Sequence, residues 1–215
     1  MADELKSPKV FGIGFQKTGT TSLGTAFRAL GYKMEGGGRK FVPALREGDL
    51  SQVFEVADRN DAFEDNPWPL LYRELDECYP GSKFILTIRD EKDWLQSVVN
   101  HLGFGPDPMQ KFVYGVGFPS GFEDVFLERY RRHNREVLAY FAERPDDLLM
   151  VDFSTGAGWE ALCGFLGHDI PDREFPHNFR GIYTPQKRRS RQVVSKVIHG
   201  LRWVVGRDGK VEFQS

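Results

Sequence analysis

The sequence has little cysteine and no apolar run long enough to cross a membrane. Among its 215 residues only Cys78 and Cys163 are cysteines, far apart and without partners at the spacing of metal ligands. Neither a disulfide framework nor a zinc site is therefore predicted. The first residues also lack the basic start and apolar core of a secretory signal. We expect a cytoplasmic protein with no metal centre and no membrane partner.

Its overall charge is also close to balanced, but the charges are unevenly placed. The net charge is -2, yet residues 180–215 hold nine lysines and arginines against two acidic residues. Such a basic segment suits a phosphate-bearing ligand, a nucleic acid or an anionic membrane, or is simply a solvated surface. With 40% apolar and 28% charged residues the chain is of ordinary globular composition. We expect residues 1–215 to form a single domain.

Short apolar runs alternate with stretches of helical periodicity. The apolar runs predict strands at 10–15, 61–65, 83–88 and 148–151. Apolar residues at helical spacing predict helices at 22–30, 68–79, 94–102, 122–144 and 159–166. The glycine-rich residues 35–39 are expected to be irregular. This order predicts an α/β fold, a three-layer sandwich with a mostly parallel central sheet.

A glycine- and threonine-rich loop follows the first predicted strand. Residues 14–22 read Gly-Phe-Gln-Lys-Thr-Gly-Thr-Thr-Ser. Between a buried strand and a helix, such a loop holds a phosphate with backbone N–H groups and the helix dipole, which is a P-loop nucleotide-binding arrangement. The nucleotide-triphosphatase pattern places a lysine where this chain has Thr20, whereas here the lysine lies inside the loop, at Lys17. A lysine there lies closer to the first phosphate, which predicts a shorter phosphate chain on the ligand.

The loop resembles the 5′-phosphosulfate loop of sulfotransferases that use 3′-phosphoadenosine 5′-phosphosulfate (PAPS). That motif is usually written P-K-[ST]-G-T-T, and Gln16 replaces its proline. We expect this departure to affect loop rigidity more than ligand chemistry. The resemblance implies a set of residues that contact the donor: Gln16, Lys17, Thr18, Gly19, Thr20 and Thr21.

The same family holds the 3′-phosphate of PAPS, and of its product 3′-phosphoadenosine 5′-phosphate (PAP), with an arginine at a strand end and a serine eight positions later. Arg89 and Ser97 have this placement. An arginine fork can grip a dianionic phosphate while the hydroxyl adds a hydrogen bond. If the loop at Lys17 were not also present, Arg89 and Ser97 would be interpreted as a surface arginine and a serine on a helix face. The similarity runs from residue 9 to about residue 180, and it implies that segment 180–215 covers the donor.

The resemblance implies sulfuryl transfer from PAPS to a hydroxyl or amine of a small-molecule acceptor. Such transfer needs alignment and charge stabilisation, which Lys17 can supply, and requires no metal ion. Asp65, at the carboxyl end of the strand predicted at 61–65, is our first choice of general base. His101, one turn beyond Ser97, is the second. Alternatively, Asp65 faces water or caps a helix, and His101 is an exposed helix-end residue. Asp61, Glu64 and, less favoured, Glu35 are further candidates for the general base.

The segment 103–121 has five glycines, three prolines and several aromatic residues. We expect it to be an irregular loop that gates the acceptor, or else a packed connector. Two rival functions stay open. One is a P-loop kinase that uses ATP and a metal held by Asp90, and the other is a catalytically silent nucleotide-binding module. We expect no nucleic-acid partner.

Overall fold

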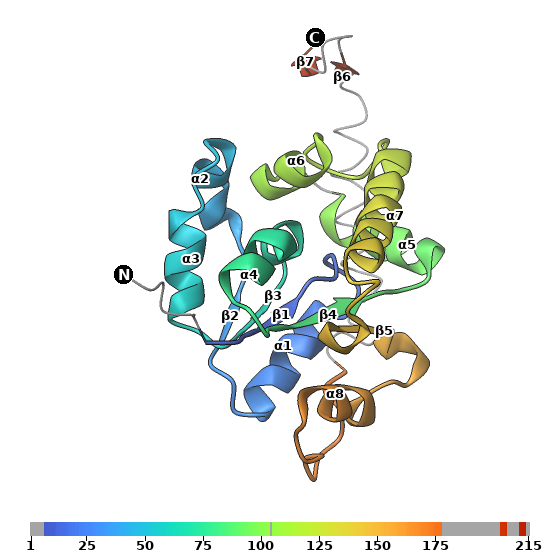
Figure 1. Ribbon diagram of the computed structural model, residues 1–215. Coiled ribbons are helices and arrows are strands. Elements are labelled where there is room, and N and C mark those ends of the chain that lie inside the picture. The colour runs from blue at the N-terminus through green and yellow to red at the C-terminus, as the bar shows by residue number, and fades with distance from the viewer. Residues whose placement is uncertain (1–6, 104, 178–202, 206–210, 214–215) are drawn as a thin grey trace.

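A five-stranded, all-parallel sheet forms the centre of the protein (Figure 1). The structure is a computed structural model and describes residues 7–103, 105–177, 203–205 and 211–213. The strand order is β2-β3-β1-β4-β5. The strands are β1 (Val10–Gly12), β2 (Met34–Gly36), β3 (Ala62–Glu64), β4 (Lys83–Thr87) and β5 (Leu148–Val151). The predicted α/β fold with a parallel sheet is confirmed.

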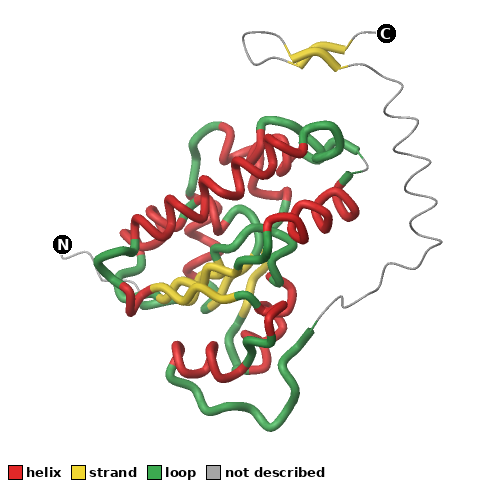
Figure 2. Tube along the Cα trace, turned by 90° about the vertical axis from the view of Figure 1, so that its right-hand side faces the viewer, coloured by secondary structure: helices red, strands yellow, loops and turns green. Residues whose placement is uncertain are grey.

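Helices cover both faces of this sheet and complete the three layers (Figures 1 and 2). On one face lie α1 (Thr20–Ala29) and α8 (Trp159–Leu166). The other face carries α3 (Ser51–Asp58), α4 (Tyr72–Cys78) and α7 (Glu123–Tyr140), and next to α7 lie α5 (Glu91–Leu102) and α6 (Pro108–Tyr114). Shorter elements are α2 (Val42–Arg46), η1 (Arg39–Phe41), η2 (Trp68–Leu70), η3 (Pro145–Asp147) and η4 (Phe153–Thr155). None of the described helices has the length and hydrophobicity needed to span a bilayer.

The apolar side chains of β4 show how the two faces are packed. Phe84 and Leu86 enter the cluster formed with α3, α4 and α7. Ile85, between them, enters the cluster formed with α1 and α8. All three are fully buried. Successive side chains of a strand point to opposite faces, so a strand buried on both faces reads as a continuous apolar run.

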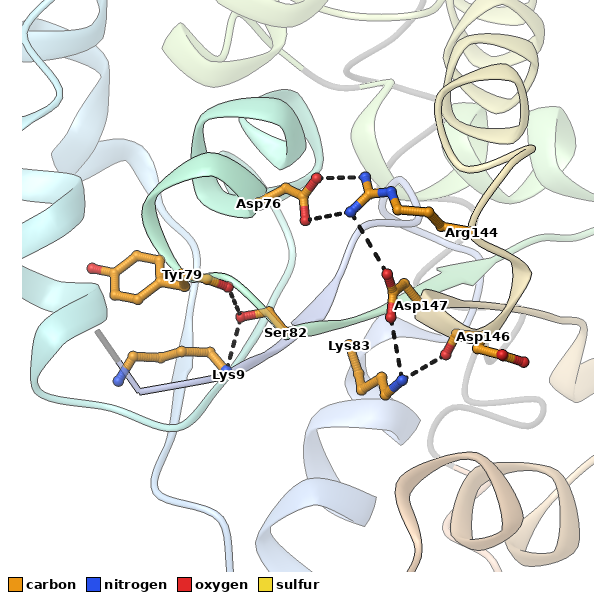
Figure 3. A network of polar contacts seen from close by, with 8 residues as sticks. All are labelled: Lys9, Asp76, Tyr79, Ser82, Lys83, Arg144, Asp146 and Asp147. Atoms are coloured by element: carbon orange, nitrogen blue, oxygen red, sulfur yellow. Dashed lines mark hydrogen bonds and ion pairs between the residues drawn. The ribbon is translucent and has the colours of Figure 1, made fainter. Parts of the chain in front are cut away.

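A network of polar contacts lies at the amino-terminal ends of strands β4 and β5 (Figure 3). Arg144 makes two hydrogen bonds to Asp76 of α4, at 3.1 and 2.5 Å. Lys83, the first residue of β4, donates to the Asp146 carbonyl at 2.7 Å and to Asp147 at 3.3 Å. These contacts join α4 to Arg144, which precedes η3, and join η3 to the first residue of β4. They lie away from the carboxyl ends of the strands, so their role is structural.

Two segments differ from the sequence predictions. The stretch predicted to be irregular at 35–39 begins with β2, which pairs in parallel with β3. The segment predicted to be an irregular loop at 103–121 contains α6. Asp107 begins that helix by accepting hydrogen bonds from the amides of Met109 and Gln110, at 2.8 and 3.0 Å. An aspartate cap followed by proline at the first helical position is a strong start signal, and it outweighs the glycines on either side.

Segment 180–215, expected to cover a ligand, lies largely outside the described residues. Only β6 (Trp203–Val205) and β7 (Val211–Phe213) are described there, and they pair antiparallel.

Candidate functional site

A cavity of about 420 Å³ opens at the carboxyl edge of the sheet. The loops that follow parallel strands all leave from the carboxyl edge of the sheet. Ligands bind at this edge, at the point where the chain connections of two neighbouring strands lead in opposite directions. Here β1 has β3 on one side and β4 on the other, so the loops after all three strands meet. Most of the predicted site residues line this cavity: Gln16, Lys17, Gly19, Thr20, Thr21, Asp65, Arg89, Ser97 and His101.

The loop after β1 passes very close to β4. A Cβ atom on Gly14 would lie 2.1 Å from the Thr87 hydroxyl and 2.3 Å from its carbonyl oxygen, so only glycine fits. Thr18 is buried beside it, with its hydroxyl 2.6 Å from both the Phe15 carbonyl and the Thr87 hydroxyl. The Thr18 amide also bonds to the Phe15 carbonyl, at 3.4 Å. Thr18, one of the predicted donor contacts, therefore stabilises the loop through its buried hydroxyl and is not among the residues that line the cavity.

The amino end of α1 faces the cavity without a side-chain cap. Gly19 precedes the helix with φ 104° and makes no side-chain cap, and no acidic residue lies in the first turn of α1. The N–H groups that begin a helix carry partial positive charge and lack partners within the helix. Lys17, with φ 72°, adds a full positive charge from the same loop. This end of the cavity can hold an anionic group.

Arg89 supplies a second positive centre, directly after β4. The Tyr130 hydroxyl fixes its backbone, because it lies 3.0 Å from both the Arg89 amide and the Arg89 carbonyl. The Nε atom of Arg89 is buried and has no hydrogen-bond partner among the described residues. A buried donor without a partner calls for an acceptor, and a phosphate would supply one. Ser97 lines the same cavity from α5.

Helix α5 is anchored at its start and to the loop. Asp90 caps it by accepting from the amides of Lys92 and Asp93, at 3.0 and 3.2 Å. The Trp94 indole donates to the Gln16 carbonyl at 3.0 Å. The side chain that a kinase would use for a metal therefore serves as a helix cap here. Among the described residues, no group of three or more His, Cys, Asp or Glu side chains is arranged to hold a metal ion.

Asp65 lies one residue beyond β3 and lines the cavity. It has φ 67°, a left-handed conformation that aspartate tolerates better than most residues, and it accepts a hydrogen bond from the Asn66 amide at 2.8 Å. Burial raises the pKa of its carboxyl, while the Asn66 bond and the charge of Lys17 oppose the rise. A carboxylate with a raised pKa is a better proton acceptor near neutral pH.

The other carboxylates considered from the sequence have different surroundings. Glu64, the last residue of β3, lies outside the cavity lining, and its pKa is raised to about 7, first by burial and then by the charge of Asp65. Asp61 precedes β3, where it accepts from the Lys33 amide at 3.1 Å. Glu35 pairs with Lys40. Of all the base candidates, the structure brings Asp65 and His101 to the cavity.

Seven further residues that the sequence analysis did not name individually line the cavity. They are Gly38, Arg39, Asn66, Leu102, Asp107, Met109 and Gln110. Arg39 and Asp107 form an ion pair of 2.5 Å, which joins the segment after β2 to the start of α6. Three of the seven, Asp107, Met109 and Gln110, belong to segment 103–121, which was expected to gate the acceptor, and the Asp107-Pro108 helix start is a local signal for α6. We call these seven residues the far wall.

The fold is of the α/β class with an all-parallel central sheet, and the loop that carries Lys17 joins β1 to α1. A family model described as "Sulfotransferase domain" matches residues 9–120 and 107–181. The chain therefore belongs to the sulfotransferase domain family, and the resemblance seen in its motifs is confirmed. It is also similar to "Ava biosynthesis cluster protein M" of Aspergillus versicolor, with 27% identity over 245 aligned positions that span 87% of this chain and 89% of that protein.

Proposed function

We propose that this sulfotransferase-domain protein uses PAPS as its donor and transfers the sulfuryl group to a hydroxyl or amine of a small-molecule acceptor. One observation carries the proposal. The start of α1 after Gly19, the loop of Lys17, and the Nε of Arg89, which has no hydrogen-bond partner in the described part of the chain, all border one cavity. Two separated anion sites fit a nucleotide that carries phosphates at both its 5′ and 3′ positions.

The donor contacts that we propose follow the family resemblance and are supported by the position of these residues at the cavity. PAPS, when bound, supplies an activated sulfuryl group whose leaving group is the 5′-phosphate of PAP. Backbone amides of Gly19, Thr20 and Thr21 and the ammonium of Lys17 hold the 5′ end. The Lys17 charge matters most at the bridging oxygen, where negative charge develops as the bond breaks. Arg89 and Ser97 hold the 3′-phosphate.

Asp65 is our proposed general base. It shares the cavity with Lys17, and burial makes its carboxylate more basic than usual. It would accept the acceptor's proton on the carboxylate as the acceptor oxygen or nitrogen attacks. His101, on the last turn of α5, is the second candidate for this role.

The acceptor would lie between Asp65 and the far wall. A cavity of about 420 Å³ is within the usual range for small-molecule sites, so a compact acceptor fits better than a nucleic acid. The cytoplasm stays our proposed location, in keeping with two unpaired cysteines. Cell fractionation with an antibody against the chain tests this.

Ligand-induced thermal stabilisation tests the donor. We expect PAP to raise the melting temperature in a concentration-dependent way, and adenosine 5′-phosphate, ATP and NAD to raise it much less. Equal stabilisation by adenosine 5′-phosphate would show that the 3′-phosphate is not recognised. Transfer of ³⁵S from labelled PAPS to a panel of alcohols, phenols and amines, with a chelator present, then tests activity. Phosphorylation of the same panel by ATP, dependent on Mg²⁺, would instead support a kinase.

A further inference from the structure

Gln16 is the residue at which this chain departs from the usual motif, and it is buried, with 8% of its surface exposed. It stands immediately before Lys17, where the motif usually has a proline. Proline has no side-chain hydrogen-bonding groups, so whatever the amide of Gln16 contacts is a feature of this chain rather than of the general motif.

The amide of Gln16 joins two elements that are distant in sequence. Its Oε1 accepts from Nδ2 of Asn66 at 2.8 Å, and its Nε2 donates to the hydroxyl of Tyr114 at 2.6 Å. The Nε2 atom also lies 3.5 Å from Oε1 of Gln110. Asn66 and Gln110 are themselves buried, at 4% and 5% exposure. Buried polar groups of this kind hold a fixed arrangement because losing one partner leaves the others unsatisfied.

The side-chain partners of Gln16 lie in two different parts of the site, the loop after β3 and helix α6. The backbone N–H of Asn66 donates to the carboxylate of Asp65. Gln110 belongs to the far wall, and Tyr114 ends the helix that carries it. The backbone carbonyl of Gln16 accepts from Trp94 of α5, the helix of Ser97. A shift of the loop at Lys17 would therefore change the positions of both Asp65 and α6.

We propose that Gln16 is a positioning residue that couples occupation of the phosphate loop to the position of α6. Binding of an anion at Lys17 fixes the loop, and the Gln16 amide fixes α6 through Gln110 and Tyr114. The donor site and the far wall then become ordered in one step, before an acceptor enters. This inference rests on the proposed donor, because it needs a ligand that occupies the loop.

Amide hydrogen exchange with and without PAP tests the coupling, and PAP affinity is measured in parallel by titration calorimetry. In the unaltered protein we expect PAP to slow exchange both in residues 17–22 and in α6. In Gln16→Met, which keeps the length but removes both polar atoms, PAP is added to saturation, at the concentration that calorimetry on that variant requires, and we expect the loop still to be protected. The added protection of α6 should be lost.

Two further variants make the result decisive. Tyr114→Phe removes only the hydroxyl at the far end of the 2.6 Å bond, and it should lose the α6 effect as well, even if Gln16→Met does not fold. Tyr79→Phe removes a hydroxyl that is bonded to Asp58 of α3 at 2.7 Å, and it should keep the effect. Equal α6 protection by PAP in all four proteins, or none in the unaltered protein, overturns the coupling. Failure of PAP to bind at all would instead overturn the proposed donor.

Discussion

Replacing Asp65 with asparagine separates its proposed chemical role from its structural one. Asparagine keeps the shape, tolerates the left-handed conformation at φ 67° and retains an oxygen that can accept from the Asn66 amide. It loses only the charge and the basicity. Melting temperature should therefore hold, or rise slightly, because a partly buried carboxylate no longer has to be desolvated.

The expected kinetic loss follows from the role of a general base. Removing such a group typically lowers turnover by about a hundredfold to ten-thousandfold, which is roughly 3 to 5 kcal/mol of barrier. PAP should bind as tightly or somewhat more tightly, because a negative charge near Lys17 has gone. Transfer of ³⁵S to the best acceptor of the panel gives the rate, and calorimetry with PAP gives the affinity.

Two controls sharpen the interpretation of this variant. Asp65→Ala removes the acceptor oxygen and the tolerance of a left-handed backbone, so it should lower stability by roughly 1 to 3 kcal/mol as well as abolish turnover. His101→Asn tests the second candidate. Near-normal turnover in Asp65→Asn would refute the assignment, and a collapse in His101→Asn would then transfer the role to that histidine.

Three more substitutions test the donor site and its surroundings. Arg89→Ala should weaken PAP binding by at least thirtyfold, as for other truncated buried charge partners, and leave adenosine 5′-phosphate binding unchanged in calorimetry. Lys17→Ala should depress kcat more than PAP affinity, and a change confined to KM would contradict its role. The raised pKa of Glu64, about 7 against 4.5 unperturbed, means that the folded protein holds this proton more tightly, so unfolding free energy falls as pH rises between those values. Glu64→Gln should remove that loss, and urea unfolding at pH 5 and pH 8 should show a larger gain at pH 8; an equal difference at both would contradict it.

The sequence predicted those parts of the site that depend on local pattern. A buried strand followed by a glycine-rich loop and a helix start is recognisable within about fifteen residues, and this placed Lys17 correctly at the cavity. Arg89 and Ser97 were indicated by the family resemblance, which pairs an arginine at a strand end with a serine eight positions later, and both line the cavity. The sheet itself followed from the alternation of apolar runs and helical periods.

The remaining features depend on contacts between distant residues. Gln16 bonds to residues 50, 94 and 98 positions away, so no local window contains its partners. Strand β2 exists because it pairs with β3, and its own glycine-rich sequence favours irregular structure. Helix α6 was missed for the opposite reason. Its start at Asp107-Pro108 is a local signal for a helix, but the five glycines of segment 103–121 favour an irregular loop.

The two proposed chemical groups of the site influence each other electrostatically. Among the described residues, Lys17 and Asp65 are the non-glycine positions with positive φ, and such strained conformations concentrate at functional sites. The charge of Lys17 lowers the pKa of Asp65, against the larger effect of burial. An anion bound at Lys17 would offset that charge, and the pKa of Asp65 would rise further. The proposed base would thus gain proton affinity in the complex in which an acceptor proton has to be removed.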